Sequence, residues 1–162
     1  MRITNHCPTE TPLGVRKNTN MTEIKEYDKN NNLIHLRNSK GYEEWREYDE
    51  KGNVTHYRTS YGYERWHEYD ANNNLIHNRT STGFESWYEY DEKGNVTHNR
   101  TSDGYERWAE YDEKGNEIHY RNSDGVESWR EYDANNNLIH SRDSKGREFW
   151  YDEKGKKYTT LV

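Results

Sequence analysis

One stretch of the chain, residues 90–110, decides the fold: it reads YDEKGNVTHNRTSDGYERWAE. Its residue types return every 21 residues, so that Tyr-Asp begins at positions 27, 48, 69, 90, 111 and 132, and a seventh pair, Tyr151-Asp152, comes two residues early. A fixed period of this length indicates one supersecondary unit repeated in tandem. We therefore predict six to seven repeats over residues 26–155, an irregular N-terminal arm or cap over residues 1–25, and a C-terminal cap over residues 156–162.

Two turns divide each repeat. The first, Asp-Glu-Lys-Gly or Asp-Ala-Asn-Asn in most repeats, always ends in Gly or Asn, the residues that best tolerate a positive φ. The second, Ser-x-Gly as in residues 102–104, fits a three-residue type I loop with a glycine bulge. The segments between the turns are rich in strand-forming Tyr, Trp, Thr, Val and Ile. The pattern predicts an all-β fold of tandem 21-residue β-hairpin repeats, forming a long, twisted antiparallel meander that coils into a superhelical, solenoid-like sheet.

The composition excludes an ordinary globular core. Hydrophobic residues make up 28% of the 162 residues and charged residues 33%, a balance usual for disordered chains. Disordered chains are poor in aromatic residues, however, and this chain holds six Trp and fifteen Tyr, whose rings bury large areas. An ordered, thin sheet with an aromatic spine is therefore favoured.

Charge, cysteine content and hydropathy exclude further classes. The formal net charge of −6 disfavours nonspecific binding to nucleic acid, which requires basic patches. Cys7 is the single cysteine, which leaves no internal disulfide framework and no all-Cys zinc site. The sequence holds no apolar run of membrane-spanning length and no leader-peptide pattern. We therefore expect a cytoplasmic protein that does not bind membranes.

The turn lengths predict which side chains share a face of the sheet. With a three-residue Ser-x-Gly loop, His98 lies opposite Trp108, and Arg100 lies opposite Glu106. With a four-residue Asp-x-x-Gly loop, Trp87 lies opposite His98 and, by the same register, Glu85 opposite Arg100. Both registers keep Trp, His, Arg and Glu on one face, termed the tryptophan face, because side chains alternate along a strand.

On the tryptophan face we predict three rows across the strands. One alternates His and Trp, one alternates Arg and Glu, and one alternates Leu or Val with Glu, with Glu117 interrupting the apolar series. Each cross-strand pair contributes roughly 0.2–1 kcal/mol. We expect the Trp row to be buried on the sheltered, concave side. The predicted structural ladders are His56, Trp66, His77, Trp87, His98 and Trp108 in the first row, and Arg58, Glu64, Arg79, Glu85, Arg100 and Glu106 in the second.

The turn-forming positions resemble those of a known family. Residues 90–97 read Tyr-Asp-Glu-Lys-Gly-Asn-Val-Thr, with Gly104 ten residues after Gly94, and residues 48–55 followed by Gly62 repeat this frame. The frame is similar to the YD repeats of Rhs and teneurin proteins, over residues 27 to about 155. The resemblance implies spiralling β-hairpins, which in long arrays of the family enclose a toxin or other cargo. We expect no such shell here, since the repeats are few, no toxin-like domain follows them, and the Trp, His and Arg rows depart from the family's pattern. A looser likeness is to choline- and glucan-binding repeats, whose Gly-Trp and Trp-Tyr-Tyr signatures are absent.

Neither polar row fits a reactive site. Equivalent histidines lie two strands apart, about 9–10 Å, whereas ligand atoms of a metal converge to within about 2.3 Å of the ion. The Arg and Glu row repeats uniformly, whereas a catalytic site needs a singular constellation with shifted pKa values. The sequence contains no phosphate-binding loop, nucleophile elbow or metal-spaced Cys/His set. We therefore predict no enzyme activity, no cofactor and no metal.

The opposite face, termed the variable face, differs from repeat to repeat. Drift on a solvated face explains such variation, and the alternative is a patch that recognises a partner, because Tyr and Arg are enriched at interface anchors. Its rows hold Leu36, Tyr57, Asn78, Asn99, Tyr120 and Ser141, then Glu44, Arg65, Ser86, Arg107, Ser128 and Phe149, then Arg46, His67, Tyr88, Ala109 and Arg130. The candidate binding residues are Tyr57, Tyr61, Tyr63, Arg65 and His67 at the centre, with Tyr88, Arg107, Tyr120 and Arg130 beside them.

These observations predict a non-enzymatic repeat scaffold that binds another protein, of the kind used by bacterial or phage inhibitors such as immunity or anti-defence proteins. The alternative is a carbohydrate- or cell-wall-binding module whose exposed Trp row stacks on the sugar rings of a glycan.

Overall fold

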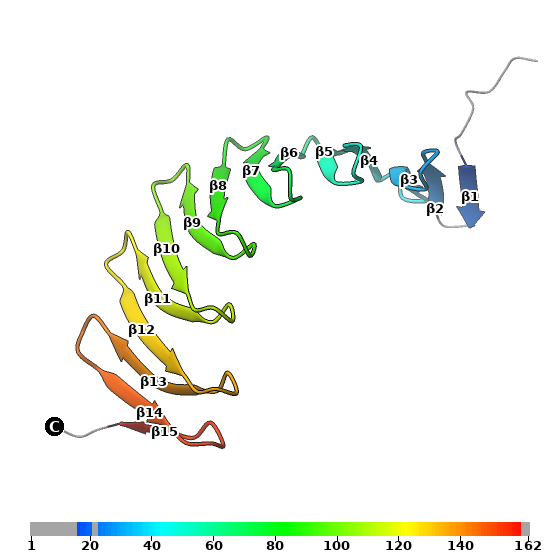
Figure 1. Ribbon diagram of the computed structural model, residues 1–162. Helices are drawn as coiled ribbons and strands as arrows, with labels where there is room; N and C mark the ends of the chain where they lie inside the picture. Colours follow the sequence, from blue (N-terminus) through cyan, green and yellow to red (C-terminus); the bar gives the residue numbers. More distant parts are fainter. Residues whose placement is uncertain (1–15, 21–22, 160–162) are drawn as a thin grey trace, which may run out of the picture. The chain divides into compact units, whose positions relative to one another are not determined.

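The computed structural model describes residues 16–20 and 23–159, which form strands joined by tight turns (Figure 1). The order of the 15 strands in the sheet is their order in the sequence. No helix occurs in this part of the chain. The predicted all-β fold, a twisted antiparallel meander of tandem hairpins, is confirmed. The chain divides into two compact units, Met1–Trp66 and His67–Val162.

The strands are short and nearly uniform in length. Their bounds are β1 Arg16–Asn20, β2 Glu23–Tyr27, β3 Leu33–Asn38, β4 Glu43–Tyr48, β5 Val54–Thr59, β6 Glu64–Tyr69, β7 Leu75–Thr80, β8 Glu85–Tyr90, β9 Val96–Thr101, β10 Glu106–Tyr111, β11 Glu117–Asn122, β12 Glu127–Tyr132, β13 Leu138–Asp143, β14 Glu148–Tyr151 and β15 Lys157–Thr159.

The first hairpin begins earlier than the sequence pattern indicates. An irregular arm or cap was expected over residues 1–25, whereas β1 lies within this stretch and pairs with β2, which begins at Glu23, with Arg16 opposite Tyr27. The repeat motif misses β1 because this strand holds neither Trp nor His, and no Ser-x-Gly turn follows it. Residues 1–15 of the expected arm, and residues 160–162 of the expected C-terminal cap, lie outside the described residues.

Each Tyr-Asp turn is closed by its aspartate. Asp91 accepts hydrogen bonds at one carboxylate oxygen from the main-chain N–H groups of Lys93 and Asn95, both at 2.9 Å, and at the other from the Asn95 side chain, also at 2.9 Å. Gly94 adopts a φ of 86°, and the equivalent Asn73 adopts 71°. The prediction that Gly and Asn occupy this position because of a positive φ is confirmed.

A β-bulge follows the Tyr-Asp turn and corrects the predicted register. Tyr90 lies opposite Val96, but the next pair is Glu89 with His98, so Thr97 is the extra residue. Trp87 consequently lies opposite Arg100, and the predicted pairs of Trp87 with His98 and of Glu85 with Arg100 are wrong. The aspartate cap imposes a three-residue loop, and a bulge, rather than a fourth loop residue, restores the parity of the faces. Across the Ser-x-Gly turn the predicted register is confirmed, with His98 opposite Trp108 and Arg100 opposite Glu106.

The bulge also moves the aliphatic position to the variable face. Val96 pairs with Tyr90, which alternates along β8 with the Tyr88 and Ser86 of that face. The predicted third row, with Leu or Val beside Glu on the tryptophan face, is therefore wrong. Its exceptional member, Glu117, lies on the variable face in the same way, opposite Tyr111.

Hydrogen bonds at both ends of the strands join one 21-residue repeat to the next. The phenol of Tyr111 donates to the carbonyl oxygen of Val96 at 2.9 Å. At the other end, the N–H of Ser102 donates to the Glu85 carbonyl at 2.8 Å, and the Ser102 hydroxyl accepts from the Glu85 N–H at 2.9 Å. The Tyr of the Tyr-Asp turn and the Ser of the Ser-x-Gly turn thus both form hydrogen bonds to the preceding repeat.

The sheet has no conventional core. Within the described part of the chain no large side chain is fully buried, and Ala109 is the one hydrophobic residue that is buried. The predicted burial of the Trp row is wrong: its members are half-buried, and Trp150 is 46% exposed. Cross-strand ladders must replace a core here, because a single layer leaves both faces open to water.

Candidate functional site

Rows of mixed composition cross the tryptophan face. One row starts at Glu89 on β8 and continues through the residues opposite it on successive strands: His98, Trp108, Arg121 and Glu127. The predicted rows of a single pair type are wrong, because the bulge shifts every second strand pair by two residues.

Four of the indoles in these rows are covered on both ring faces. Trp87 stacks on His77 with ring centroids 5.1 Å apart and planes 7° apart, and the guanidinium of Arg100 lies 4.1 Å from its ring centroid. Such cation–π contacts contribute roughly 0.5–1 kcal/mol at exposed sites. The same arrangement holds for Trp45 between His35 and Arg58, Trp108 between His98 and Arg121, and Trp129 between His119 and Arg142.

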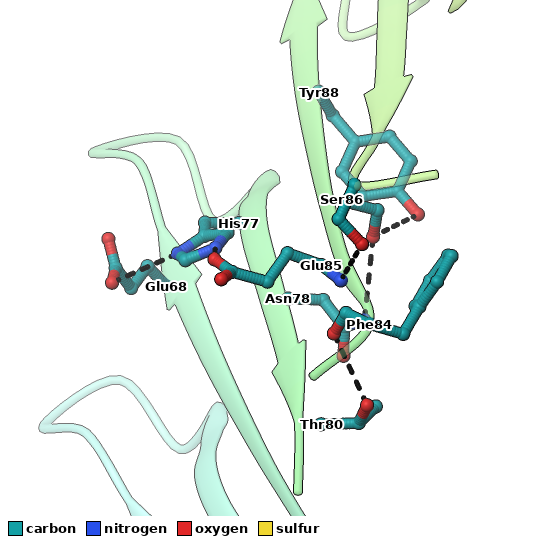
Figure 2. Close-up of polar contacts among 9 residues, drawn as sticks. Glu68, His77, Asn78, Thr80, Phe84, Glu85, Ser86 and Tyr88 are labelled. Carbon is teal, nitrogen blue, oxygen red and sulfur yellow. Dashed lines mark hydrogen bonds and ion pairs between the residues drawn. The ribbon is translucent and has the colours of Figure 1, made fainter. Parts of the chain in front are cut away.

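Five of the imidazoles lie between two carboxylates: those of His35, His56, His77, His98 and His119. In Figure 2, His77 Nδ1 lies 3.2 Å from Glu68 and Nε2 lies 2.8 Å from Glu85. Carboxylates accept hydrogen bonds, and an imidazole donates from both nitrogens only when protonated. For His119, burial lowers the pKa, but the hydrogen bonds and charges of Glu127 and Glu110 outweigh it, so the pKa is raised above its ordinary value. No group of three or more His, Cys, Asp or Glu side chains able to hold a metal ion occurs among the residues that the structure describes.

On the variable face of the first unit, four tyrosines gather into what we term the tyrosine patch: Tyr42, Tyr57, Tyr61 and Tyr63. The Tyr42 and Tyr57 hydroxyls lie 3.0 Å apart, and each lies within hydrogen-bonding distance of the Glu44 carboxylate, at 3.0 and 3.1 Å; because each hydroxyl has one proton, two of these three contacts are hydrogen bonds at any moment. The hydrogen bond with Tyr57, then burial and the Glu44 charge, raise the pKa of Tyr42.

The outer part of the tyrosine patch faces solvent. Tyr61, at the tip of the β5–β6 loop, is 80% exposed, and its ring centroid lies 5.7 Å from that of Tyr42. The Tyr57 and Tyr63 rings meet edge to face, with centroids 6.4 Å apart. Arg65 lies opposite Tyr57 on β6.

The structure brings together four of the five central residues predicted from the sequence: Tyr57, Tyr61, Tyr63 and Arg65. His67 lies at the start of the second unit, its ring 6.2 Å from that of Tyr69. Sequence reasoning missed Tyr42, and it placed Glu44 on the variable face without making it a candidate. The signal was present, because Tyr42 occupies the same repeat position as Tyr63.

The remaining predicted residues lie in the second unit. Tyr88 accepts a hydrogen bond from Ser86, a small side chain that is only 2% exposed and also accepts from Asn78 (Figure 2). Further along, Arg107 and Arg130 both hydrogen-bond the carboxylate of Glu117. The Tyr120 ring lies beneath Arg107, 5.1 Å from its guanidinium.

Comparison with known proteins shows which solved structures share this arrangement of hairpins. No family model matches the chain, and no curated protein matches its sequence. Solved structures of Rhs-type YD-repeat proteins do match its fold. The TcdB2-TccC3-Cdc42 structure gives a TM-score of 0.64 at 22% identity, over 78% of this chain and 7% of that one. The TcdB2-TccC3-TEV structure gives 0.67 at 17% identity, over 85% and 9%.

The chain has the fold of a YD-repeat array. The resemblance found in the turn motifs is thereby confirmed at the level of structure. The chain spans between 7% and 9% of the length of these solved proteins. It is an array of tandem β-hairpins, like the parts of those proteins that it matches. In the described ranges, no helix is long and apolar enough to span a membrane.

Proposed function

We propose that this YD-repeat array is a non-enzymatic scaffold that binds another protein through the tyrosine patch. The observation that carries the proposal is Tyr61, a large aromatic side chain that is 80% exposed yet lies against Tyr42. Tyr and Arg are the residues most enriched at interface hot spots. The hydrogen bonds among Tyr42, Tyr57 and Glu44 fix the base of the patch, which reduces the entropy lost on binding.

The covered indoles disfavour the carbohydrate alternative. Sugar rings stack on the open face of an aromatic ring, but both faces of Trp45, Trp87, Trp108 and Trp129 are occupied by an imidazole and a guanidinium. A glycan would have to displace one of these groups before it could stack.

The repetition of the polar rows supports a role without chemistry. A catalytic site needs one constellation that differs from its surroundings, whereas the His, Trp, Arg and Glu pairs recur with nearly constant geometry. A binding role of this kind suits a tether or an inhibitor, such as a bacterial immunity protein or a phage anti-defence protein.

The test compares two variants as baits. Immobilised wild-type protein is used to capture partners from a bacterial lysate, beside a Tyr61→Ala/Arg65→Ala variant and a Tyr158→Ala control that removes an exposed tyrosine far along the sequence. We expect the double variant to lose specific partners that the wild-type protein and the control retain, with unchanged circular dichroism. Identical captured proteins for all three baits would contradict the proposal. Saturable quenching of Trp fluorescence by polysaccharide would favour the carbohydrate alternative.

A further inference from the structure

The two faces of the second unit carry opposite charge. Its tryptophan face carries two glutamates for every arginine: Glu68, Glu85, Glu89, Glu106, Glu110, Glu127, Glu131 and Glu148 against Arg79, Arg100, Arg121 and Arg142. Its variable face carries the reverse balance, Arg107, Arg130, Arg147 and Lys157 against Glu117 and Asp143. A protein of net charge −6 therefore presents one basic surface.

Glu117 breaks the repeat pattern at the centre of this basic surface. The equivalent position is aliphatic in the other five full repeats, as Leu33, Val54, Leu75, Val96 and Leu138. At this one place Arg107 on β10 reaches one carboxylate oxygen of Glu117 on β11, and Arg130 on β12 reaches the other. A cluster of side chains that occurs once in an otherwise regular array is the place where we expect a specific contact with a partner.

The geometry of this triad orients two guanidiniums without neutralising both. One carboxylate balances one arginine, so the cluster keeps one surplus positive charge. Each guanidinium has five N–H donors, and the side chains of Arg107 and Arg130 are 29% and 35% exposed, against 16% for Glu117. The Tyr120 ring beneath Arg107 adds a flat support that restricts the plane of its guanidinium.

We propose that Arg107 and Arg130 bind a carboxylate of an acidic segment on a partner protein. Paired, pre-oriented guanidiniums match the planar, two-oxygen geometry of Asp and Glu side chains. The surplus of one charge suits a single carboxylate. Nucleic acid is disfavoured, because its binding requires many neutralised phosphates and this cluster has one surplus positive charge. The site belongs to the second unit and shares no residue with the tyrosine patch of the first.

The test uses a fluorescein-labelled oligoglutamate peptide and the full chain, followed by fluorescence anisotropy at low salt. Glu117→Gln removes the competing carboxylate, and we expect it to tighten peptide binding severalfold. Arg107→Gln/Arg130→Gln/Glu117→Leu removes both donors and restores the aliphatic residue of the other repeats, so that no carboxylate is left unpaired. We expect this triple variant to weaken binding about tenfold, the effect of losing charge-assisted hydrogen bonds.

Two controls separate this site from general electrostatics and from the tyrosine patch. Arg37→Gln removes an equal charge from the tryptophan face, and Tyr61→Ala alters the tyrosine patch; both should bind the peptide as the wild-type protein does. Equal peptide affinity for the wild-type protein and the triple variant would overturn the proposal. So would equally tight binding of a single-stranded oligonucleotide with the same dependence on the two arginines.

Discussion

Tyr111 donates a hydrogen bond from its phenol to the main-chain carbonyl oxygen of Val96, 2.9 Å away and fifteen residues earlier. Val96 stands beside the bulge, where the strand ladder is interrupted, and the tyrosine of the next repeat supplies a donor to its carbonyl. The same bond joins Tyr48 to Leu33 and Tyr90 to Leu75. In these repeats the Tyr of the Tyr-Asp motif thus couples the repeat that it begins to the repeat before it.

Removing this hydroxyl should weaken that coupling. We expect Tyr111→Phe to lower the free energy of unfolding by about 1 kcal/mol, because a half-buried carbonyl loses its donor. Urea denaturation followed by circular dichroism measures the change. Tyr61→Phe, which removes a hydroxyl from an exposed ring, is the matched control and should have little effect. A loss of equal size in both variants would show that the inter-repeat bond contributes nothing.

The sequence predicts the turns and the sharing of faces but not the full register. The turns at Asp91, Gly94 and Gly104 depend on residue types within the turn itself, so one sequence is enough to predict them. A four-residue loop, and a three-residue loop followed by a bulge at Thr97, both leave Trp, His, Arg and Glu on one face, but they differ in which residues lie opposite and in which face carries Val96. The difference depends on the hydrogen bonds that Asp91 makes in the folded turn, which the residue types alone do not give.

The same limit applies to the candidate sites. The exposed Tyr61 and its neighbours Tyr63 and Arg65 can be predicted, because they are close in sequence. The contacts of Glu117 with Arg107 and Arg130 cannot, because they exist only if the bulge turns the aliphatic position toward the variable face.

The carboxylates around His119 should make the stability of the array fall on the alkaline side. The folded-state pKa of His119 is raised above 6.5 by Glu127 and Glu110, which outweigh the opposing effect of burial. The stabilisation from the protonated ring is therefore fully present below about pH 6.5 and is lost as the pH rises through the folded pKa. NMR titration of the imidazole should give a midpoint above 6.5, and Glu127→Gln should lower it. A midpoint at or below 6.5 in the wild-type protein would contradict the idea that the two carboxylates stabilise the protonated ring.

The aspartate turns should respond in the opposite direction. Hydrogen bonds from the side chain and then the main-chain N–H of Asn95, and from the N–H of Lys93, hold the pKa of Asp91 below its ordinary value of 3.8. The stabilisation is present above about pH 3.8 and is lost as the pH falls through the folded pKa. Asn95→Ala should move the Asp91 pKa back toward 3.8 in a carboxyl NMR titration. If the substitution leaves the midpoint unchanged, the asparagine is not what holds the carboxylate.

The positive φ angles give a test that separates backbone strain from packing. Gly104 has a φ of 91°, and a Cβ built there meets nothing within 4 Å. We expect Gly104→Ala to cost about 1–2 kcal/mol from the left-handed backbone alone. Asn136, with a φ of 68°, already tolerates this region, so Asn136→Gly should change stability by only a few tenths of a kcal/mol. Thermal unfolding of both variants measures the difference. If Gly104→Ala does not lower the free energy of unfolding, the loop can adopt another conformation.

The covered indoles predict how the tryptophan face responds when one cover is removed. Arg100 lies over Trp87, whereas Arg37, at the same repeat position, lies opposite Ile24. Arg100→Gln should therefore cost about 0.5–1 kcal/mol of cation–π energy, while Arg37→Gln removes the same charge without uncovering an indole and should cost less. Acrylamide quenching of Trp fluorescence should increase for Arg100→Gln alone, because one face of the Trp87 ring becomes accessible. If Arg37→Gln increases quenching equally, charge rather than coverage controls access to the indoles. If Arg100→Gln also gains saturable quenching by polysaccharide that the wild-type protein lacks, then the guanidinium is what keeps sugars off this face.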